Sequence, residues 1–334
     1  MKKWMRRILV FIMVATMALM TVCCGEKENT AKETKEKKIK IVTTIFPEYD
    51  WVRELLGERI DDVTLTLLQK EGMDLHSYQP SVWDMAKIAD CDLFIYLGGS
   101  SDEWVKRAMV NSTNKNQQVL NLMDILGDDK KEEELVKGMQ EEQEDLGDTH
   151  GGDDTELDEH IWLSLKNARK LTKSIKDALI KIDSGHETEY EKNGAMYDEK
   201  LDALDKEYRH MVEEARRDTL VFGDRFPFRY LTDDYDLTYY AAFPGCSGET
   251  EASFETVVFL ANKVDELGIK DILVLENADG KVAASIKNST KEKNHKIREL
   301  NSMQSVKEHD IDAGETYLGI MEQNLTVLKT ALYD

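Results

Sequence analysis

One uninterrupted helical stretch, residues 186–217, divides the folded part of the sequence into two halves. Its apolar residues recur at intervals of three, four and seven, no proline interrupts it, and Gly194 is its one glycine. About 30 helical residues span roughly 45 Å, which is more than a compact lobe requires. A coiled-coil partner is the alternative explanation. Because strand patterns resume directly after the stretch, a single helix linking two lobes is the better interpretation.

Strands and helices alternate on both sides of this stretch. The strand-like runs lie near residues 39–45, 63–68, 92–97 and 118–122, and again near 219–222, 237–243, 271–275 and 296–300. Helices are expected near residues 49–59, 167–182, 252–267, 281–287 and 314–332, two more are expected to start near Ser81 and Ser101, and a loop is expected over 223–230. Such alternation predicts parallel βαβ units. We therefore expect an α/β protein with two Rossmann-like lobes, each a roughly four-stranded parallel sheet with flanking helices, joined by one long rigid helix.

The N-terminal residues have the pattern of a targeting segment. Basic residues precede the apolar run 8–22, which ends at Cys23 and Cys24. This order is typical of a secretory signal, and the run is shorter than the roughly 20 residues that a membrane-spanning helix needs. It is similar to a bacterial lipoprotein signal, with an uncleaved anchor helix as the alternative. We expect a signal peptide over 1–24 with Cys24 acylated (alternatively Cys23), and a disordered tether over 25–38.

The chain is strongly acidic. Its 66 acidic and 44 basic residues give a formal net charge of −22 at pH 7. Nucleic-acid binding requires a clustered basic surface, so we expect no nucleic-acid partner. A net charge of this sign would favour the binding of cations. The simpler explanation of the charge by itself is an acidic surface that keeps the protein soluble and has no selective role. Residues 127–158 are especially acidic and predict a mobile, solvated insertion, in which His150 is better explained as an exposed histidine than as a metal ligand.

Two histidines lie in segments that favour a ligand-binding role. His76 lies in a short loop between the strand-like run 63–68 and a helix that begins after Ser81. Ligand groups of open α/β sheets lie at this position, outside the carboxyl ends of the strands. His160 is followed closely by Trp162. Either histidine alone is explained equally well by helix capping or by aromatic packing, but together they predict that His76 and His160 bind one divalent cation.

The segments around these histidines, 72–80 and 158–164, resemble the ligand motifs of a known family. This family comprises the metal-binding lipoproteins, or solute-binding proteins, that supply zinc or manganese to ATP-binding-cassette (ABC) importers. Residues 314–331 are similar to its closing helix, and the acidic segment lies where zinc-specific members carry a His-rich loop. The resemblance covers nearly all of the mature chain. It implies a metal site between an N-terminal lobe, residues 39–185, and a C-terminal lobe, residues 218–334.

The family's metal usually has four protein ligands, and the C-terminal lobe of this chain departs from that pattern. Aligning the family's third motif places Arg225, which cannot coordinate a metal, at the third ligand position. Asn301 falls near the fourth. Asp224 is the nearest carboxylate, and Glu276 ends an apolar strand that should point into the cleft. We therefore expect Asp224 and Glu276 to complete a site begun by the two histidines, with an ion pair to an arginine as the alternative role of Glu276.

Two imidazoles with carboxylate oxygens favour Zn²⁺ as the transported ligand, and more oxygen ligands would favour Mn²⁺. The resemblance implies an ABC permease and its ATPase as partners, and a monomer that is extracytoplasmic and lipid-anchored to the bacterial cell membrane. We expect no enzymatic activity, since no His-Glu-x-x-His motif is present. A zinc-dependent hydrolase and a surface adhesin remain the alternatives. Cys91 and Cys246 are expected in different lobes, so no disulfide is predicted between them.

Overall fold

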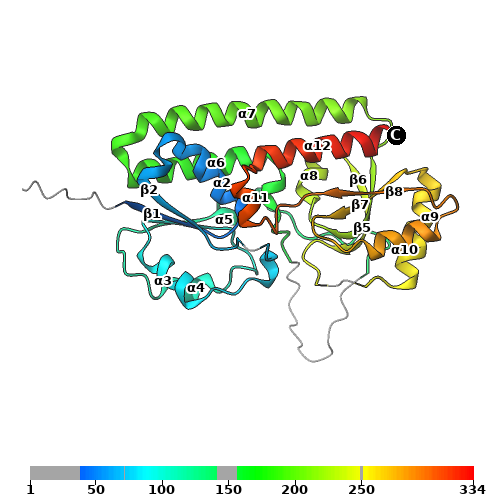
Figure 1. Cartoon of the computed structure of the whole chain (residues 1–334), viewed down its shortest axis with the longest axis horizontal. Coiled ribbons are helices and arrows are strands. Elements are labelled where there is room, and N and C mark those ends of the chain that lie inside the picture. Colours follow the sequence, from blue (N-terminus) through cyan, green and yellow to red (C-terminus); the bar gives the residue numbers. More distant parts are fainter. Residues whose placement is uncertain (1–37, 71, 141–155, 249–250) are drawn as a thin grey trace, which may run out of the picture. The chain divides into compact units, whose positions relative to one another are not determined.

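Figure 1 shows a computed structural model of the chain, which describes residues 38–70, 72–140, 156–248 and 251–334. The expected signal peptide with Cys23 and Cys24, and the expected tether up to residue 37, lie outside the described residues, as does His150. Residues 38–334 cluster into one unit. Within the described ranges, no helix combines the length and the apolar character needed to cross a membrane.

The first lobe is built on a four-stranded parallel sheet with the strand order β2-β1-β3-β4. Its strands are β1 (Ile39–Thr43), β2 (Val63–Leu67), β3 (Leu93–Tyr96) and β4 (Gln118–Asn121). Its helices are α2 (Phe46–Leu56), α3 (Val82–Asp90), α4 (Val105–Met109), α5 (Leu122–Leu126) and α6 (Leu165–Ile182). The carboxyl ends of these parallel strands share one edge, so the loops that follow β2 and β3 lie close to each other.

The second lobe repeats this plan with the strand order β6-β5-β7-β8. Its strands are β5 (Thr219–Phe226), β6 (Thr238–Pro244), β7 (Asp271–Leu275) and β8 (Lys296–Leu300). Its helices are α8 (Arg229–Asp234), α9 (Phe254–Leu267), α10 (Lys281–Ser289), α11 (Glu308–Asp312) and α12 (Tyr317–Tyr333). The predicted α/β class with two four-stranded parallel sheets is therefore confirmed.

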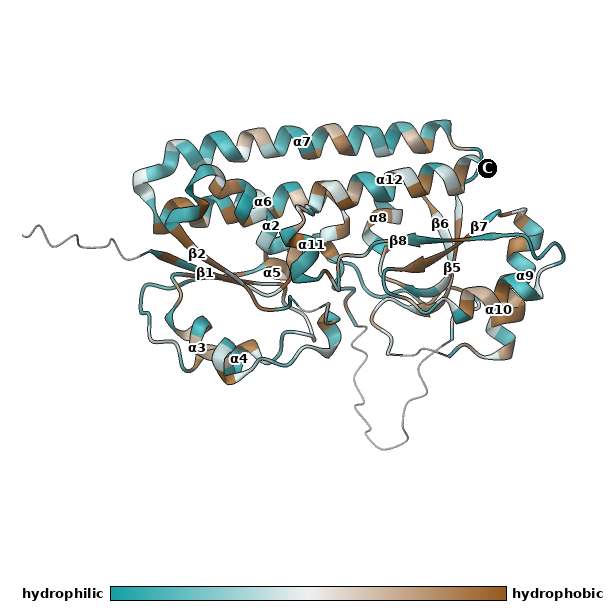
Figure 2. Ribbon diagram, viewed as in Figure 1, coloured by the Kyte–Doolittle hydropathy of each residue, from teal (hydrophilic) through white to brown (hydrophobic). Residues whose placement is uncertain are grey.

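The long helix that the sequence predicts is α7 (Glu187–Glu214). Its buried residues are Tyr190, Tyr197, Leu201, Leu204, Tyr208 and Met211, which follow the periodicity of the sequence. Most of its other positions are hydrophilic (Figure 2). The helix packs along α2 and α6 of the first lobe and along the C-terminal helix α12, which also contacts strands of the second lobe. One long helix thus spans both lobes, as Figure 1 shows.

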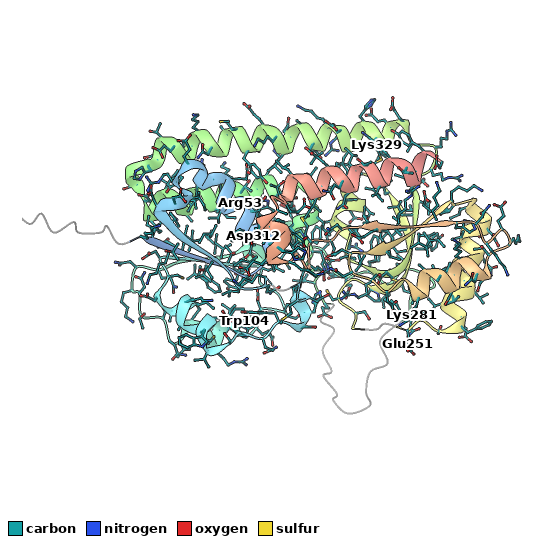
Figure 3. All side chains as sticks on the ribbon, in the orientation of Figure 1. Arg53, Trp104, Glu251, Lys281, Asp312 and Lys329 are labelled. Carbon is teal, nitrogen blue, oxygen red and sulfur yellow. The ribbon has the colours of Figure 1, made fainter. Side chains whose placement is uncertain are left out.

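One hydrophobic core continues from the first lobe through α7 and α12 into the second. Tyr317, at the start of α12, has its ring 5.2 Å from that of Trp51 in α2, measured between centroids. Its backbone N–H donates to Asp50 at 2.7 Å, and its hydroxyl donates to the carbonyl of Trp162 at 2.6 Å. Arg53 of α2, labelled in Figure 3, donates to the carbonyl of Glu315. The C-terminal helix therefore binds the two lobes to each other.

Several element boundaries differ from the sequence expectation for identifiable reasons. The helix expected at 49–59 begins at Phe46, because a proline is well tolerated in its first turn, and it ends before Gly57, whose φ is 53°. The loop expected over 223–230 contains instead the end of β5 and the start of α8. The register of β5 against β6 shifts between Phe222 and Arg225. The polar residues at this irregularity interrupt the hydrophobic pattern by which the sequence would identify the strand.

The acidic segment 127–158 also differs from expectation in its described part. Residues 130–140 do not extend into solvent but pack on the second lobe, where the backbone N–H of Gln140 donates to the carbonyl of Ala242 at 2.9 Å. A Cβ added to Gly138 would lie 2.1 Å from the ring of Phe259, so this close approach requires glycine. Residues 141–155 lie outside the described residues. The segment therefore links the lobes before the chain returns to His160.

Candidate metal centre

His76 lies in a single 3-10 turn (Leu75–Ser77) at the carboxyl side of β2. The carboxylate of Asp74 caps this turn by accepting from the backbone N–H of His76 at 3.0 Å. Leu75 is buried and anchors the turn to the core. The His76 ring places Nδ1 2.9 Å from the hydroxyl of Ser101, which lies in the loop after β3. The loops that follow two neighbouring strands thus position one imidazole.

His160 is fully buried, with 0% of its surface exposed. Asp158 holds it twice: its carboxylate oxygen Oδ1 accepts from the backbone N–H at 2.8 Å and lies 3.0 Å from Nδ1 of the ring. The ring also packs edge-on against Trp162, with 5.4 Å between centroids. The indole N–H of Trp162 donates to the carbonyl of Ser302 in the second lobe. The Asp-x-His-x-Trp segment therefore fixes the imidazole between the lobes.

A glycine–serine loop after β3 surrounds the buried carboxylate of Glu159. This carboxylate accepts from the backbone N–H of Ser101 at 2.9 Å and from the hydroxyls of Ser100 and Ser101. Gly99 has a φ of 79°, and a Cβ there would lie 2.1 Å from the Glu159 carboxylate. Since the Ser101 hydroxyl donates to Glu159, it accepts from Nδ1–H of His76.

The two imidazoles face each other through their Nε2 atoms, which lie 3.4 Å apart. The acceptors beside the Nδ1 atoms, the hydroxyl of Ser101 for His76 and the carboxylate of Asp158 for His160, favour the tautomer of each neutral ring with its proton on Nδ1. In this tautomer each Nε2 presents a lone pair to the other. Burial, followed by the neighbouring His160, lowers the pKa of His76 to about 3, so its ring is neutral at pH 7. Two lone pairs at this distance repel each other unless a cation lies between them.

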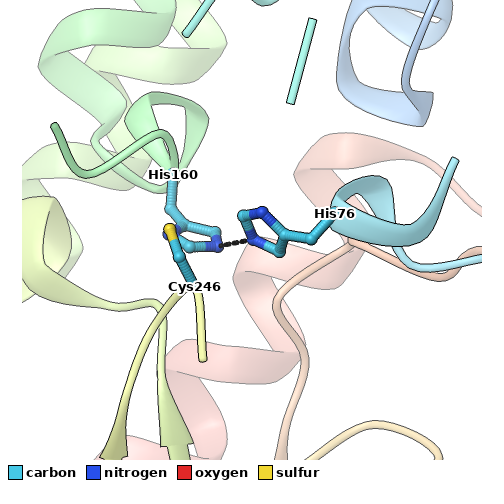
Figure 4. Close-up of side chains that lie close together, drawn as sticks. All are labelled: His76, His160 and Cys246. Carbon is cyan, nitrogen blue, oxygen red and sulfur yellow. Dashed lines mark hydrogen bonds between the residues drawn. The ribbon is translucent and has the colours of Figure 1, made fainter. Parts of the chain in front are cut away.

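Cys246 brings a thiol to the same point. One ligand atom of Cys246, Sγ, and one ring nitrogen each of His76 and His160 lie within 4.8 Å of one another, and Figure 4 shows the three side chains converging. Among the described residues, this group contains no carboxylate. Burial raises the pKa of the Cys246 thiol. Both Cys246 and Cys91, which lies buried in the first lobe after α3, are free cysteines.

The two predicted carboxylates lie elsewhere in the second lobe and are engaged by its backbone. Asp224 accepts from the backbone N–H groups of Arg225 at 2.8 Å and Leu275 at 3.1 Å. Glu276 accepts from the N–H groups of Ser302 at 2.7 Å and Gln304 at 3.1 Å, and burial raises its pKa. The structure therefore brings His76 and His160 together but does not bring these carboxylates into their group.

The two residues that depart from the family pattern have structural partners. The guanidinium of Arg225 pairs with Asp74 of the first lobe, with 2.6 Å between Nη2 and Oδ2. Arg225 also donates to the carbonyl of Ser247 at 3.3 Å. The backbone carbonyl of Asn301 accepts from the amide of Asn324 in α12 at 2.7 Å. Arg225 thus forms a bridge between the lobes directly beside the His76 turn.

A cavity of about 700 Å³ adjoins the group and is lined by residues of both lobes. Its lining includes His76 and Cys246, together with Asp224, Arg225 and Glu276. His160, which is fully buried, is not part of this lining. The site is therefore enclosed on the side of His160 and open toward the cavity on the side of His76 and Cys246.

Sequence reasoning missed three participants in this site. Cys246 received no role, although it follows the carboxyl end of β6 as His76 follows β2, and this position is a usable signal. Ser101 and Glu159 act through His76, and their spacing in the sequence gives no indication of their contact. His76 follows a strand of the first sheet and Cys246 follows a strand of the second, so only the packed chain brings both of them to His160.

The family model and the curated relatives described next are named for zinc. Residues 41–331 match the family described as "Zinc-uptake complex component A periplasmic". The chain is 32% identical over 319 residues to the zinc-binding lipoprotein AdcA of Streptococcus pneumoniae serotype 4, a match that covers 95% of this chain but only 60% of that relative. It is 28% identical over 331 residues to the high-affinity zinc uptake system protein ZnuA of Bacillus subtilis, covering 99% of this chain and 98% of that one.

A solved structure shares the fold. The crystal structure of the Zn(II)-bound ZnuA-like domain of S. pneumoniae AdcA superimposes with a TM-score of 0.68 at 31% sequence identity. This match covers 89% of the present chain and 100% of that domain. The present chain therefore spans about 60% of the length of the full streptococcal relative.

Proposed function

The chain belongs to the zinc-uptake complex component A family, and we propose that it binds one Zn²⁺ ion between its two lobes and delivers the ion to an ABC importer. Relatives named for zinc binding and zinc uptake support zinc as the cargo. His76 and His160 are the two nitrogen ligands in this proposal. They need no large rearrangement, because hydrogen bonds already orient both rings.

The distance between the two Nε2 atoms carries the proposal. Zinc–nitrogen bonds of about 2.0–2.1 Å in tetrahedral geometry separate two nitrogen ligands by about 3.3 Å. The observed separation is 3.4 Å. A zinc ion between the rings would replace the repulsion of two lone pairs by two coordinate bonds. Asp158 and Ser101 would then act as the outer partners that hold each Nδ1–H.

Mn²⁺ is the alternative cargo, and it prefers oxygen ligands. That Asp224 and Glu276 supply oxygen ligands stays a prediction. Each carboxylate would first have to give up hydrogen bonds from backbone N–H groups before it could bind a metal. Imidazole nitrogens that are already preorganised favour zinc. The cargo that we propose is therefore Zn²⁺.

We further propose the cellular setting of this cargo. The protein acts outside the cytoplasm, in line with the periplasmic family that it matches. It is anchored to the membrane by a lipid on Cys24, or alternatively on Cys23, and it transfers the ion as a monomer to an ABC permease and its ATPase. It performs no chemical reaction on the metal. Its task is to bind the ion outside the cell and to release it at the permease.

Titration with zinc tests this function directly. The wild-type chain is expected to bind one equivalent of Zn²⁺ in calorimetry and to unfold at a higher temperature with zinc, since a ligand at 100 times its Kd stabilises by about 2.7 kcal/mol. Mn²⁺ at the same concentration is expected to give a smaller shift. In zinc-limited cells that lack the protein, the wild-type chain should restore growth, and a chain with both His76→Ala and His160→Ala should not. Growth restored equally by both chains would contradict the proposal.

The outer carboxylate of His160 supplies a second test. Asp158→Ala removes the partner of Nδ1–H, so the ring loses its fixed orientation, and zinc is expected to bind about 10- to 100-fold more weakly. Calorimetry against a competing chelator measures the change. Asp183→Ala is a matched control, because Asp183 also pairs with a histidine Nδ1, that of His186, at 2.9 Å but outside the site. Equal losses in both variants would show that the effect does not arise at the metal.

A further inference from the structure

The geometry points to Cys246 as the third protein ligand of the metal, supplied as a thiolate by the second lobe. This inference rests on the proposed function and names a ligand of the same site. Cys246 lies in the turn that follows β6 (Thr238–Pro244), at the carboxyl edge of the second sheet. Figure 4 shows its side chain directed at the two imidazoles of the first lobe. The metal would therefore contact both lobes through side chains that already converge.

The turn that carries Cys246 is built to lie against His160. A Cβ added to Gly245 would lie 2.8 Å from the carbonyl oxygen of Phe226 and 3.1 Å from Cε1 of His160. A larger residue at 245 would push the turn away from the ring. The backbone N–H of Cys246 donates to the Glu133 carboxylate at 2.9 Å and holds the turn from the other side. These contacts hold the backbone of the turn that carries the sulfur.

The distances between the three ligand atoms would fit a tetrahedral metal ion after a small shortening. Bonds of about 2.3 Å to sulfur and about 2.0–2.1 Å to nitrogen place the sulfur about 3.6 Å from each nitrogen. The three ligand atoms already lie within 4.8 Å of one another. A movement of at most about 1.2 Å at the turn would close the difference. A movement of that size lies within side-chain adjustment and needs no rotation of the lobes.

The other charged side chains of the second lobe near the site already form ion pairs or hydrogen bonds with other groups. Arg225 pairs with Asp74 and donates to the carbonyl of Ser247, which is the residue next to Cys246. Asp224 accepts two backbone N–H groups, and Glu276 accepts the N–H groups of the turn at Ser302. The thiol is therefore the second-lobe group that reaches the ion without breaking such hydrogen bonds.

A sulfur ligand changes what the site selects. Thiolate is a soft ligand that binds Zn²⁺ well and is a poor partner for Mn²⁺, so a His₂Cys set discriminates against manganese. Three protein ligands leave the fourth tetrahedral position free. The cavity beside the site is lined by His76 and Cys246, so this position faces the cavity. A water or a small anion can occupy it, which gives the ion a route for exchange.

Co²⁺ provides a spectroscopic test, because a cobalt–thiolate bond produces a charge-transfer band in the near ultraviolet that nitrogen and oxygen ligands do not. We would use the full chain in detergent with Cys23→Ser and Cys24→Ser, so that no thiol of the N-terminal segment interferes. Wild-type Cys246 is expected to give the band. Cys246→Ser is expected to lose it and to bind zinc about tenfold or more weakly. Cys91→Ser, the matched control at the other free thiol, should keep both the band and the affinity.

Alkylation provides a readout that needs no variant at 246. Zinc is expected to slow modification of Cys246 by iodoacetamide, followed by peptide mass spectrometry, while the rate at Cys91 stays the same. Two results together would overturn this inference and leave the proposed function standing. They are tight binding of zinc and cobalt without the charge-transfer band, and a rate of Cys246 alkylation that is the same with and without zinc. A chain that binds no zinc at all would overturn both.

Discussion

Replacing His160 by alanine is expected to weaken zinc binding by more than about 100-fold, since removal of an outer partner alone weakens metal sites by about 10- to 100-fold. The substitution removes one of two nitrogen ligands that face each other at 3.4 Å. It also leaves the Asp158 carboxylate without the ring that it orients. The same loss is expected for His76→Ala. Calorimetric titration in competition with a chelator of known affinity measures both variants.

Two features of the chain make this result interpretable. His160 is fully buried, so its removal can also lower stability, whereas the side chain of His76 is 16% exposed and its variant carries the test if the other does not fold. His309→Ala is the matched control, because its imidazole is 74% exposed and pairs only with the neighbouring Asp310 among the described residues. If either ligand variant bound zinc as tightly as the control, the site would lie elsewhere.

Trp51→Ala is expected to lower the free energy of unfolding by about 3–5 kcal/mol, as large-to-small substitutions of buried aromatic residues do. Trp51 in α2 is fully buried and contacts Tyr317 of α12 edge-on. Removing the indole therefore opens a cavity at the point where the first lobe meets the C-terminal helix. Chemical denaturation monitored by far-ultraviolet circular dichroism measures the change.

Trp83→Ala is the control for this prediction. Trp83 lies in the first turn of α3 and is 79% exposed, so its removal is expected to change stability by no more than about 0.5 kcal/mol. Because one core continues through both lobes, Trp51→Ala should shift a single cooperative transition. Two separate transitions, with only one of them shifted, would show that the lobes are stabilised independently.

The continuous core also limits how a zinc-loaded form could differ from the empty form in the proposed function. An importer can respond to the ion only if the loaded and empty forms differ, and the ion produces such a difference by contacting both lobes. The helices α7 and α12 and the Arg225–Asp74 pair already link the lobes. We therefore expect small tilts and rearranged loops, centred on the turns of His76 and Cys246, rather than a wide opening of the lobes.

Much of the fold could be predicted because it depends on local patterns. The spacing of Tyr190, Tyr197 and Leu201 predicts the buried face of α7 before any partner is known. The strand-like runs and the helices between them predict two parallel sheets. The boundaries were less accurate where polar residues interrupt a strand, as at Asp224 and Arg225 in β5. His76 and His160 could be selected because each lies in a short segment with its own pattern.

Local pattern was therefore sufficient for the class of fold, the long connecting helix and the pair of histidines, since each is encoded within a few turns or strands of chain. The completion of the site depends on distant segments. Glu276 ends a strand, as a ligand should, yet its carboxylate turns to the backbone of Ser302. Cys246 meets His160 because Gly245 lets two lobes approach closely. Only the packed chain settles which strand-end side chain of the second lobe faces the two imidazoles, because that choice depends on the backbone groups that compete for it.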